Sequence, residues 1–278
     1  MTTLTFLVIL FAAILHAIWN ALVKGGEDKL LQMAAVSVGH MPFALLALYY
    51  VPPLNFSCWP NLFLGCIFHF GYQIFLIESY KKGDLSQVYP IARASAPLMV
   101  TIVTFLFLGV KFGLPELLAI FLIIAGLLST VGMRIQHVPR NAAISALITG
   151  CFIASYSLVD GYGGRIGESP VAYYCWLSLI NGMVMIIYCK IVSPGSVSKL
   201  IGSAKWILIG GGFASFVAYS LVMWAFSQAP IAVVMAVRET SIIFAFAIGV
   251  IFLKEKLTVS KLLGTLIAVS GIIVLRIF

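Results

Sequence analysis

The chain has 278 residues, of which 62% are apolar and only 9% carry a charged side chain. Soluble domains carry about 25% charged residues, and a globule of this size must cover itself largely with polar side chains, so the composition excludes a water-soluble fold. The net charge of +8 fits basic membrane-protein loops beside anionic lipid, and it gives no reason to expect nucleic acid. We predict an all-α integral membrane protein.

Ten segments each offer the roughly 20 mostly apolar residues that a spanning helix needs. In chain order they are 5–24, 30–51, 59–80, 86–109, 113–133, 141–160, 170–192, 204–227, 231–253 and 258–277. Their connections contain Gly, Pro and charged residues, and none is long enough for a soluble domain. Continuous apolar runs, rather than alternating segments of about ten residues, exclude a transmembrane barrel. Pro42, Pro90 and Pro97 fall inside spans, so those turns should face protein or a water-filled cavity.

The two halves of the chain resemble each other weakly. Sliding the sequence by 145 residues places Arg93 on Arg238 and Gly126 on Gly271. The matched arginines are informative because charged residues are scarce here. Five helices is an odd number, so we predict two inverted five-helix repeats, residues 1–138 and 139–278. Inverted repeats are typical of secondary transporters, whose substrate site lies at the repeat interface near mid-membrane.

Three motifs suggest a family. The first span contains His-Ala-Ile-Trp-Asn at 16–20, the ninth contains Arg-Glu-Thr-Ser at 238–241, and Leu-Lys-Glu-Lys-Leu-Thr at 253–258 precedes Gly264 and Gly271. Over its whole length the chain resembles the EamA family of the drug/metabolite transporter superfamily, although segment 108–113 lacks the glutamate of the family ending. The resemblance implies a carrier whose central cavity is lined by spans one to four and six to nine. It also implies that spans five and ten are peripheral.

Polar side chains inside spans are the candidate binding groups, since each is costly unless it faces protein or water. Helical spacings of three and four residues gather several of them on shared faces. The predicted substrate-binding residues are His16, Trp19, Asn20, His40, His69, Tyr72, Gln73, Tyr89, Arg93, Tyr156, Arg238 and Glu239. The planar arginine fork suits a carboxylate or phosphonate. Glu239 or an intramembrane histidine is the candidate carrier of a coupling proton, whereas Glu78 and Asp160, at span ends, are expected to be solvated.

We predict a secondary active transporter that moves a small polar metabolite by alternating access, with protons as the candidate coupling ion. Two arginines and a glutamate suit an anion or a zwitterion, such as an amino acid or an aminophosphonate. One alternative is an aromatic cage for a quaternary amine or a nucleobase. Further alternatives are a membrane enzyme or a non-transporting assembly protein. The chain lacks the zinc-protease, hydrolase-elbow and P-loop motifs, so we do not expect an enzyme.

The predicted partners are a small-molecule substrate, coupling protons and membrane lipids, with no cofactor and no metal, in a monomer or a weak homodimer. We expect a multi-pass protein of a bacterial inner or plasma membrane. The connections on one face hold 12 of the 17 lysines and arginines, and the other face holds 3. The positive-inside rule therefore places both termini outside, whereas the family resemblance implies termini inside. We follow the charge count, because it is a property of this chain.

Overall fold

The computed structural model describes residues 1–24, 28–82, 85–130, 132, 138–251 and 258–277. The predicted ending motif at 253–257 and the end of the fifth predicted span lie outside these residues. The described elements are helices, in chain order α1 (Thr3–Lys24), α2 (Lys29–Leu48), η1 (Phe56–Cys58), α3 (Trp59–Lys82), α4 (Leu85–Phe107), α5 (Leu114–Ser129), α6 (Arg140–Ile166), α7 (Pro170–Val192), α8 (Ser196–Ile201), the π-helical η3 (Ile207–Gly211), α9 (Gly212–Gln228), α10 (Ile231–Arg238), α11 (Ser241–Ile251) and α12 (Val259–Ile277).

Local sequence explains several helix starts. Asp28 caps α2, because its carboxylate accepts a hydrogen bond from the Leu31 amide at 3.0 Å. Glu116 reaches back over the first turn of α5 and accepts from the Gly113 amide at 2.9 Å. Proline stands at the first position of α7, where its missing amide hydrogen costs nothing. The polar connections of the sequence therefore act as helix ends.

In the described part of the chain a helix corresponds to each of the ten predicted spans, and two of these helices depart from the predicted course. Within the described residues nine spans are long and apolar enough to cross a membrane, and α5 is a shorter apolar helix of 16 residues. Helix α6 continues to Ile166, beyond the predicted end at 160. The ninth predicted span is divided into α10 and α11 by the turn at Glu239 and Thr240. Both differences concern polar residues. Asp160 lies within α6 and not at a span end, and Glu239 and Thr240 lie in a turn and not within a continuous helix.

The contacts between helices are approximately the same when each helix is replaced by its counterpart in the other half of the chain. Taking α6, α7, α9, α10–α11 and α12 as the counterparts of α1 to α5, the contact of α3 with α6 has its mirror in α1 with α9. The contact of α4 with α6 likewise matches that of α1 with α11. Self-paired contacts join α2 to α7, α4 to α10, and α5 to α12. This pattern, with five helices per half, is that of two inverted repeats packed into one bundle.

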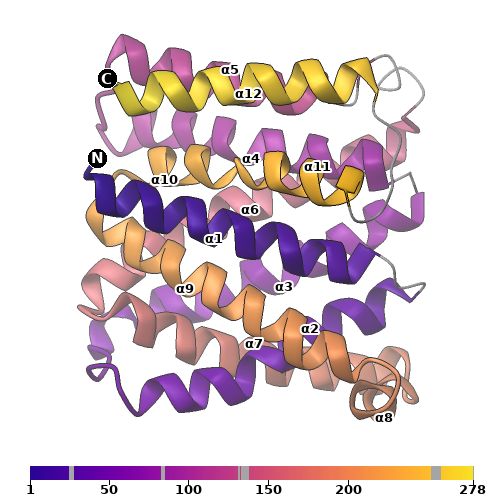
Figure 1. Ribbon diagram of the computed structural model, residues 1–278. Helices are drawn as coiled ribbons and strands as arrows, with labels where there is room; N and C mark the ends of the chain where they lie inside the picture. The colour runs from indigo at the N-terminus through magenta and orange to yellow at the C-terminus, as the bar shows by residue number, and fades with distance from the viewer. Residues whose placement is uncertain (25–27, 83–84, 131, 133–137, 252–257, 278) are drawn as a thin grey trace.

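Helices α5 and α12 form a pair at one edge of the bundle (Figure 1). Gly126 of α5 faces the α12 backbone at Gly264 and Ala268 so closely that a β-carbon would collide with it. Outward-facing side chains such as Phe121 and Leu266 are exposed, as expected for a lipid-facing surface. This arrangement agrees with the peripheral position expected for spans five and ten. Both termini lie at the same end of the bundle, and α8 lies at the opposite end (Figure 1).

Candidate functional site

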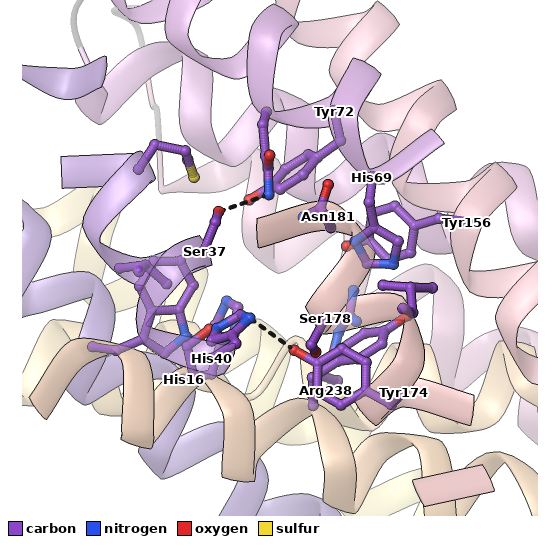
Figure 2. Close-up of a pocket in the computed structure, with 17 residues that line it drawn as sticks. His16, Ser37, His40, His69, Tyr72, Tyr156, Tyr174, Ser178, Asn181 and Arg238 are labelled. Carbon is purple, nitrogen blue, oxygen red and sulfur yellow. Dashed lines mark hydrogen bonds between the residues drawn. The ribbon is translucent and has the colours of Figure 1, made fainter. Parts of the chain in front are cut away.

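A cavity of about 70 Å³ lies between the two halves of the bundle. Its walls come from α1, α2, α3, α6, α7, α9 and α10 (Figure 2). The lining residues that the sequence predicted are His16, Trp19, His40, His69, Tyr72, Gln73, Tyr156 and Arg238. Helix α4 contributes no lining residue, so the expectation that span four lines the cavity is wrong for this conformation. Arg93 of α4 instead pairs with Glu239, in the turn after α10.

Four of the predicted site residues lie outside the cavity lining: Asn20, Tyr89, Arg93 and Glu239. The Asn20 side chain donates to the carbonyl of His16 on its own helix at 2.7 Å. Tyr89 packs beside Arg93, whose Cζ is 5.8 Å from the ring centroid. Arg93 and Glu239 are buried against each other. The structure thus brings eight predicted residues together around the cavity and places the others behind or beside it.

The two arginines flank one carboxylate. Arg93 Nε lies 2.8 Å from Glu239 Oε2, and Arg238 Nε lies 3.9 Å from Glu239 Oε1. Arg93 also donates from Nη2 to the Ser241 hydroxyl at 3.2 Å. Nε and Nη2 of Arg238 have no hydrogen-bond partner among the described residues, although the side chain is only 2% exposed. The close ion pair therefore compensates Arg93, while Arg238, which lines the cavity, has two nitrogens without a hydrogen-bond partner.

The turn between α10 and α11 positions these charges. The Thr240 amide donates to the Val237 carbonyl at 2.9 Å, and the Ile242 amide donates to the Glu239 carbonyl at 3.1 Å. These three-residue hydrogen bonds replace the regular four-residue pattern, and such tightened stretches inside a helix often mark functional sites. Interrupted helices near mid-membrane are a recurring feature of transporter binding sites. The Arg-Glu-Thr-Ser motif occupies this interruption.

A second polar cluster joins α3, α6, α7 and α9 at Asp160. His69 Nε2 lies 2.7 Å from Asp160 Oδ2, which also accepts from the Tyr219 hydroxyl at 2.9 Å. Tyr173 donates to Oδ1 at 3.3 Å. The expectation that Asp160 is solvated is wrong: its side chain is 0% exposed, because α6 continues beyond the predicted end. Within the described chain, no three His, Cys, Asp or Glu side chains gather as metal ligands would.

The remaining wall is aromatic and polar. Tyr156 stacks on His69 with 4.0 Å between ring centroids, and Tyr174 lies 4.8 Å from Tyr219. Gln73 donates to the Ser37 hydroxyl at 3.0 Å (Figure 2). Several buried lining atoms have no hydrogen-bond partner among the described residues: Oδ1 of Asn181, Oγ of Ser178, Oε1 of Gln73 and Nε2 of His40. Buried polar atoms without partners are uncommon, and these four belong to residues that line the cavity.

The predicted binding set omitted nine lining residues: Met33, Val36, Ser37, Tyr174, Leu177, Ser178, Asn181, Ser215 and Tyr219. A signal existed for some of them. Ser178 and Asn181 are three residues apart, and Ser215 and Tyr219 are four apart, so each pair shares one helix face. The apolar residues carried no such signal. Met33 lies one turn from the start of α2, so the cavity extends from mid-span toward the end of the bundle opposite the termini.

Comparison with known proteins agrees with this architecture. The model of the EamA-like transporter family matches the chain twice, over residues 3–132 and 140–277. One solved structure, described only as the crystal structure of a protein, is similar over 100% of this chain and 98% of its own, with a TM-score of 0.76 and 16% sequence identity. At that identity the likeness shows a shared fold. With both inverted repeats matched and apolar spans throughout, the chain belongs to the EamA-like transporter family and is a multi-pass integral membrane protein.

Proposed function

We propose that this transporter moves a small solute with an anionic group, and that Arg238 binds that group in the central cavity. The observation that carries the proposal is a buried, cavity-facing guanidinium with two nitrogens that have no hydrogen-bond partner among the described residues. A buried donor without a partner costs about 1–3 kcal/mol, and more when it is charged. A carboxylate or phosphonate oxygen in the cavity would remove that cost.

Charge compensation explains why Arg238, rather than Arg93, is the proposed anion site. The buried Arg, Lys, Asp and Glu side chains of the described residues are Arg93, Asp160, Arg238 and Glu239. Glu239 lies 1.1 Å closer to Arg93 than to Arg238, by the difference between 2.8 and 3.9 Å. Asp160 is held by His69 and two tyrosines on the other side of the cavity. Arg238 is therefore the positive charge with the weakest local compensation.

Cavity size and lining favour a compact zwitterion. A volume of about 70 Å³ has room for about five water molecules at roughly 15 Å³ each, which is the scale of a small amino acid or an aminophosphonate. The unpartnered oxygens of Asn181, Ser178 and Gln73 can accept from an ammonium group. The tyrosine-rich wall offers π faces to the same cation. The cavity lining thus offers groups for both the anionic group and the amine.

An aromatic cage for a cation is the second candidate, because five of the lining residues are Trp19, Tyr72, Tyr156, Tyr174 and Tyr219. The fixed positive charge of Arg238 in the same cavity opposes a cation that lacks an anionic group. A planar nucleobase would have no anion to offer the guanidinium. A quaternary amine and a nucleobase are therefore included in the binding test below, where they distinguish an aromatic cage from an anion site.

Transport by alternating access would use the inverted repeats and the interrupted span at α10–α11. In that mechanism the two halves rock about the site, so that the cavity opens to one membrane face at a time. Proton coupling is part of the proposal, and the buried titratable groups beside the cavity are its candidates.

A matched solute panel tests the proposal. Thermal shifts of the detergent-purified protein would be measured with L-alanine, L-alaninamide, aminomethylphosphonate, choline and adenine, followed by counterflow of each stabilising solute in liposomes. We expect L-alanine or aminomethylphosphonate to stabilise the protein and L-alaninamide, which lacks the carboxylate, to have no effect. Arg238→Met should lower the affinity about tenfold to a hundredfold, the value of one charged hydrogen bond. Arg238→Lys should recover only part of it, because lysine lacks the planar fork.

Two results would overturn the anion site. If choline or adenine were the only solute that stabilised the protein, the aromatic wall, and not Arg238, would be the binding site. Unchanged affinity in a folded Arg238→Met protein would show that the guanidinium does not contact the solute.

A further inference from the structure

The carboxylate of Asp160 is the most heavily hydrogen-bonded acid in the described bundle. It accepts from Tyr173 at Oδ1 and from Tyr219 at Oδ2, and His69 Nε2 lies 2.7 Å from Oδ2. Gly65 of α3 leaves the space for this carboxylate, because a β-carbon there would meet Asp160 Oδ1 and the Tyr173 hydroxyl. A buried acid in a membrane span is costly. Asp160 is accommodated by partners from α3, α7 and α9 and by the space at Gly65.

The pair of His69 and Asp160 is connected to the cavity on one side only. His69 and Tyr219 line the cavity, whereas Asp160 lies behind them with no exposed surface. If Nε2 donates to the carboxylate, the other ring nitrogen, Nδ1, is left for a proton arriving through the cavity. The aspartate would then stabilise the imidazolium that forms. In this geometry the cavity gives the proton access, His69 is the base that accepts it, and Asp160 is the counter-charge.

The surroundings of the pair contain other titratable groups, and they define its electrostatics. From α3 they are Cys66 and Tyr72, from α2 His40, from α6 Tyr156, from α7 Tyr173 and Tyr174, from α9 Tyr219, and from α10 Arg238. Tyrosine and cysteine are neutral at ordinary pH. The fixed charges near the pair are therefore the Asp160 carboxylate, in contact with His69, and the Arg238 guanidinium, which faces the same cavity.

We propose that His69 and Asp160 form the proton-binding site of the transporter, and that a bound proton and an anionic solute at Arg238 favour each other. The second part of this proposal rests on the function proposed above. A proton on His69 adds positive charge to the cavity wall and so strengthens binding of an anion. By thermodynamic reciprocity, the anion strengthens proton binding to the same degree. The two ligands would then cross the membrane together.

Glu239 is less suited to this role. It lies outside the cavity lining, behind Arg238, and its carboxylate is in contact with Arg93. Protonating it would leave two guanidiniums in the membrane interior without a counter-charge. His69, in contrast, can gain a proton while its aspartate partner stays in place.

The first test uses the proton itself as the probe. Protein labelled with ¹⁵N-histidine would be studied by NMR in lipid nanodiscs between about pH 5 and 8, the range in which histidine changes charge. The chain has four histidines, so the His69 signals are identified by their loss in His69→Gln. We expect the doubly protonated ring of His69 to be detected in these spectra, because the proposed proton site requires it. A ring that stays neutral throughout would overturn the proton site, whatever solute is carried.

The second test separates coupling from transport. In liposomes, Asp160→Asn should lose accumulation of the panel solute driven by a pH gradient by tenfold or more, relative to the unmodified protein. Glu78→Gln is the matched control: it neutralises an exposed acid at the end of α3, paired there with Lys82, and should keep gradient-driven uptake. Equal gradient-driven uptake by Asp160→Asn and the unmodified protein would overturn the coupling. Absence of counterflow for the whole panel in the unmodified protein would instead contradict the proposed function, leaving the histidine titration to decide the proton site.

Discussion

The charge cluster of Arg93, Glu239 and Arg238 gives a sharp prediction about stability. At the 2.8 Å separation of Arg93 and Glu239, Coulomb attraction is about 6 kcal/mol at an effective dielectric constant near 20. At the 3.9 Å separation of Arg238 and Glu239 it is about 4 kcal/mol. Burial of each ion costs several kcal/mol, so the net value of the cluster is small, but removal of one partner leaves an uncompensated charge.

Glu239→Gln should therefore be the most damaging single change, because it leaves two buried guanidiniums. We expect a loss of about 3–5 kcal/mol in the free energy of unfolding. Arg93→Met should cost less, since Arg238 can move toward the glutamate, and the same movement should weaken anion binding. The double variant Arg93→Met/Glu239→Gln removes both charges of the close pair and leaves one uncompensated guanidinium instead of two, so it should recover part of the loss. A coupling energy of about 3 kcal/mol is expected from this double-mutant cycle.

Unfolding of the purified protein in mixed micelles, followed by circular dichroism over increasing denaturing detergent, would give these free energies. The pair of Glu78 and Lys82, 3.1 Å apart and about 40% exposed, is the internal control. Its own cycle should give only about 0–1 kcal/mol, as for other exposed ion pairs. Additive effects of Arg93→Met and Glu239→Gln, with no recovery in the double variant, would refute the assignment of Arg93 as the partner of Glu239.

Two further predictions concern packing away from the cavity. Gly126→Leu should push α5 away from α12 and lower the free energy of unfolding by about 1–3 kcal/mol, while leaving solute affinity unchanged. The control is Gly210→Ala, at a position with open space around it, which should have little effect on either quantity. Denaturation and binding titrations of both variants check this. Arg165 donates to the carbonyls of Phe226 and Ala229 at the end of α9, so Arg165→Ala should cost about 1–3 kcal/mol. Equal stability of Arg165→Ala and the unmodified protein would contradict that capping role.

Much of the fold could be predicted from the sequence because the membrane imposes a simple rule. A span must be a continuous apolar helix of sufficient length, so apolar runs gave the spans, and the odd helix count per half gave the inversion. The interruption at Glu239 and Thr240 was not predictable in this way, because an apolar run on both sides hides a change of hydrogen-bond pattern. Asp160 was misplaced for a related reason. Three glycines follow within four residues, so the pattern indicated a span end where α6 in fact continues.

The sequence could predict many of the residues at the candidate site. It could not predict which of them line the cavity and which pair with each other. Scarcity of charge singled out Arg93 and Arg238, and the structure places both beside the carboxylate of Glu239. Which arginine faces the cavity depends on distances that no sequence spacing contains. The histidines gave the same difficulty, since only the structure pairs His69 with an acid from another helix.

The internal repeat explains why one arginine is left without a close partner. On the slide of 145 residues, Arg93 matches Arg238, whereas Glu239 matches Ala94, a buried residue that packs among apolar side chains of α5. A strictly symmetric carrier would place one carboxylate beside each arginine, and both guanidiniums would then be compensated. Because the glutamate occurs in the second half alone, one carboxylate serves two arginines, and it lies closer to the arginine of the opposite half. The departure from symmetry is what leaves Arg238 free to face the cavity, and it is the feature on which the proposed anion specificity depends.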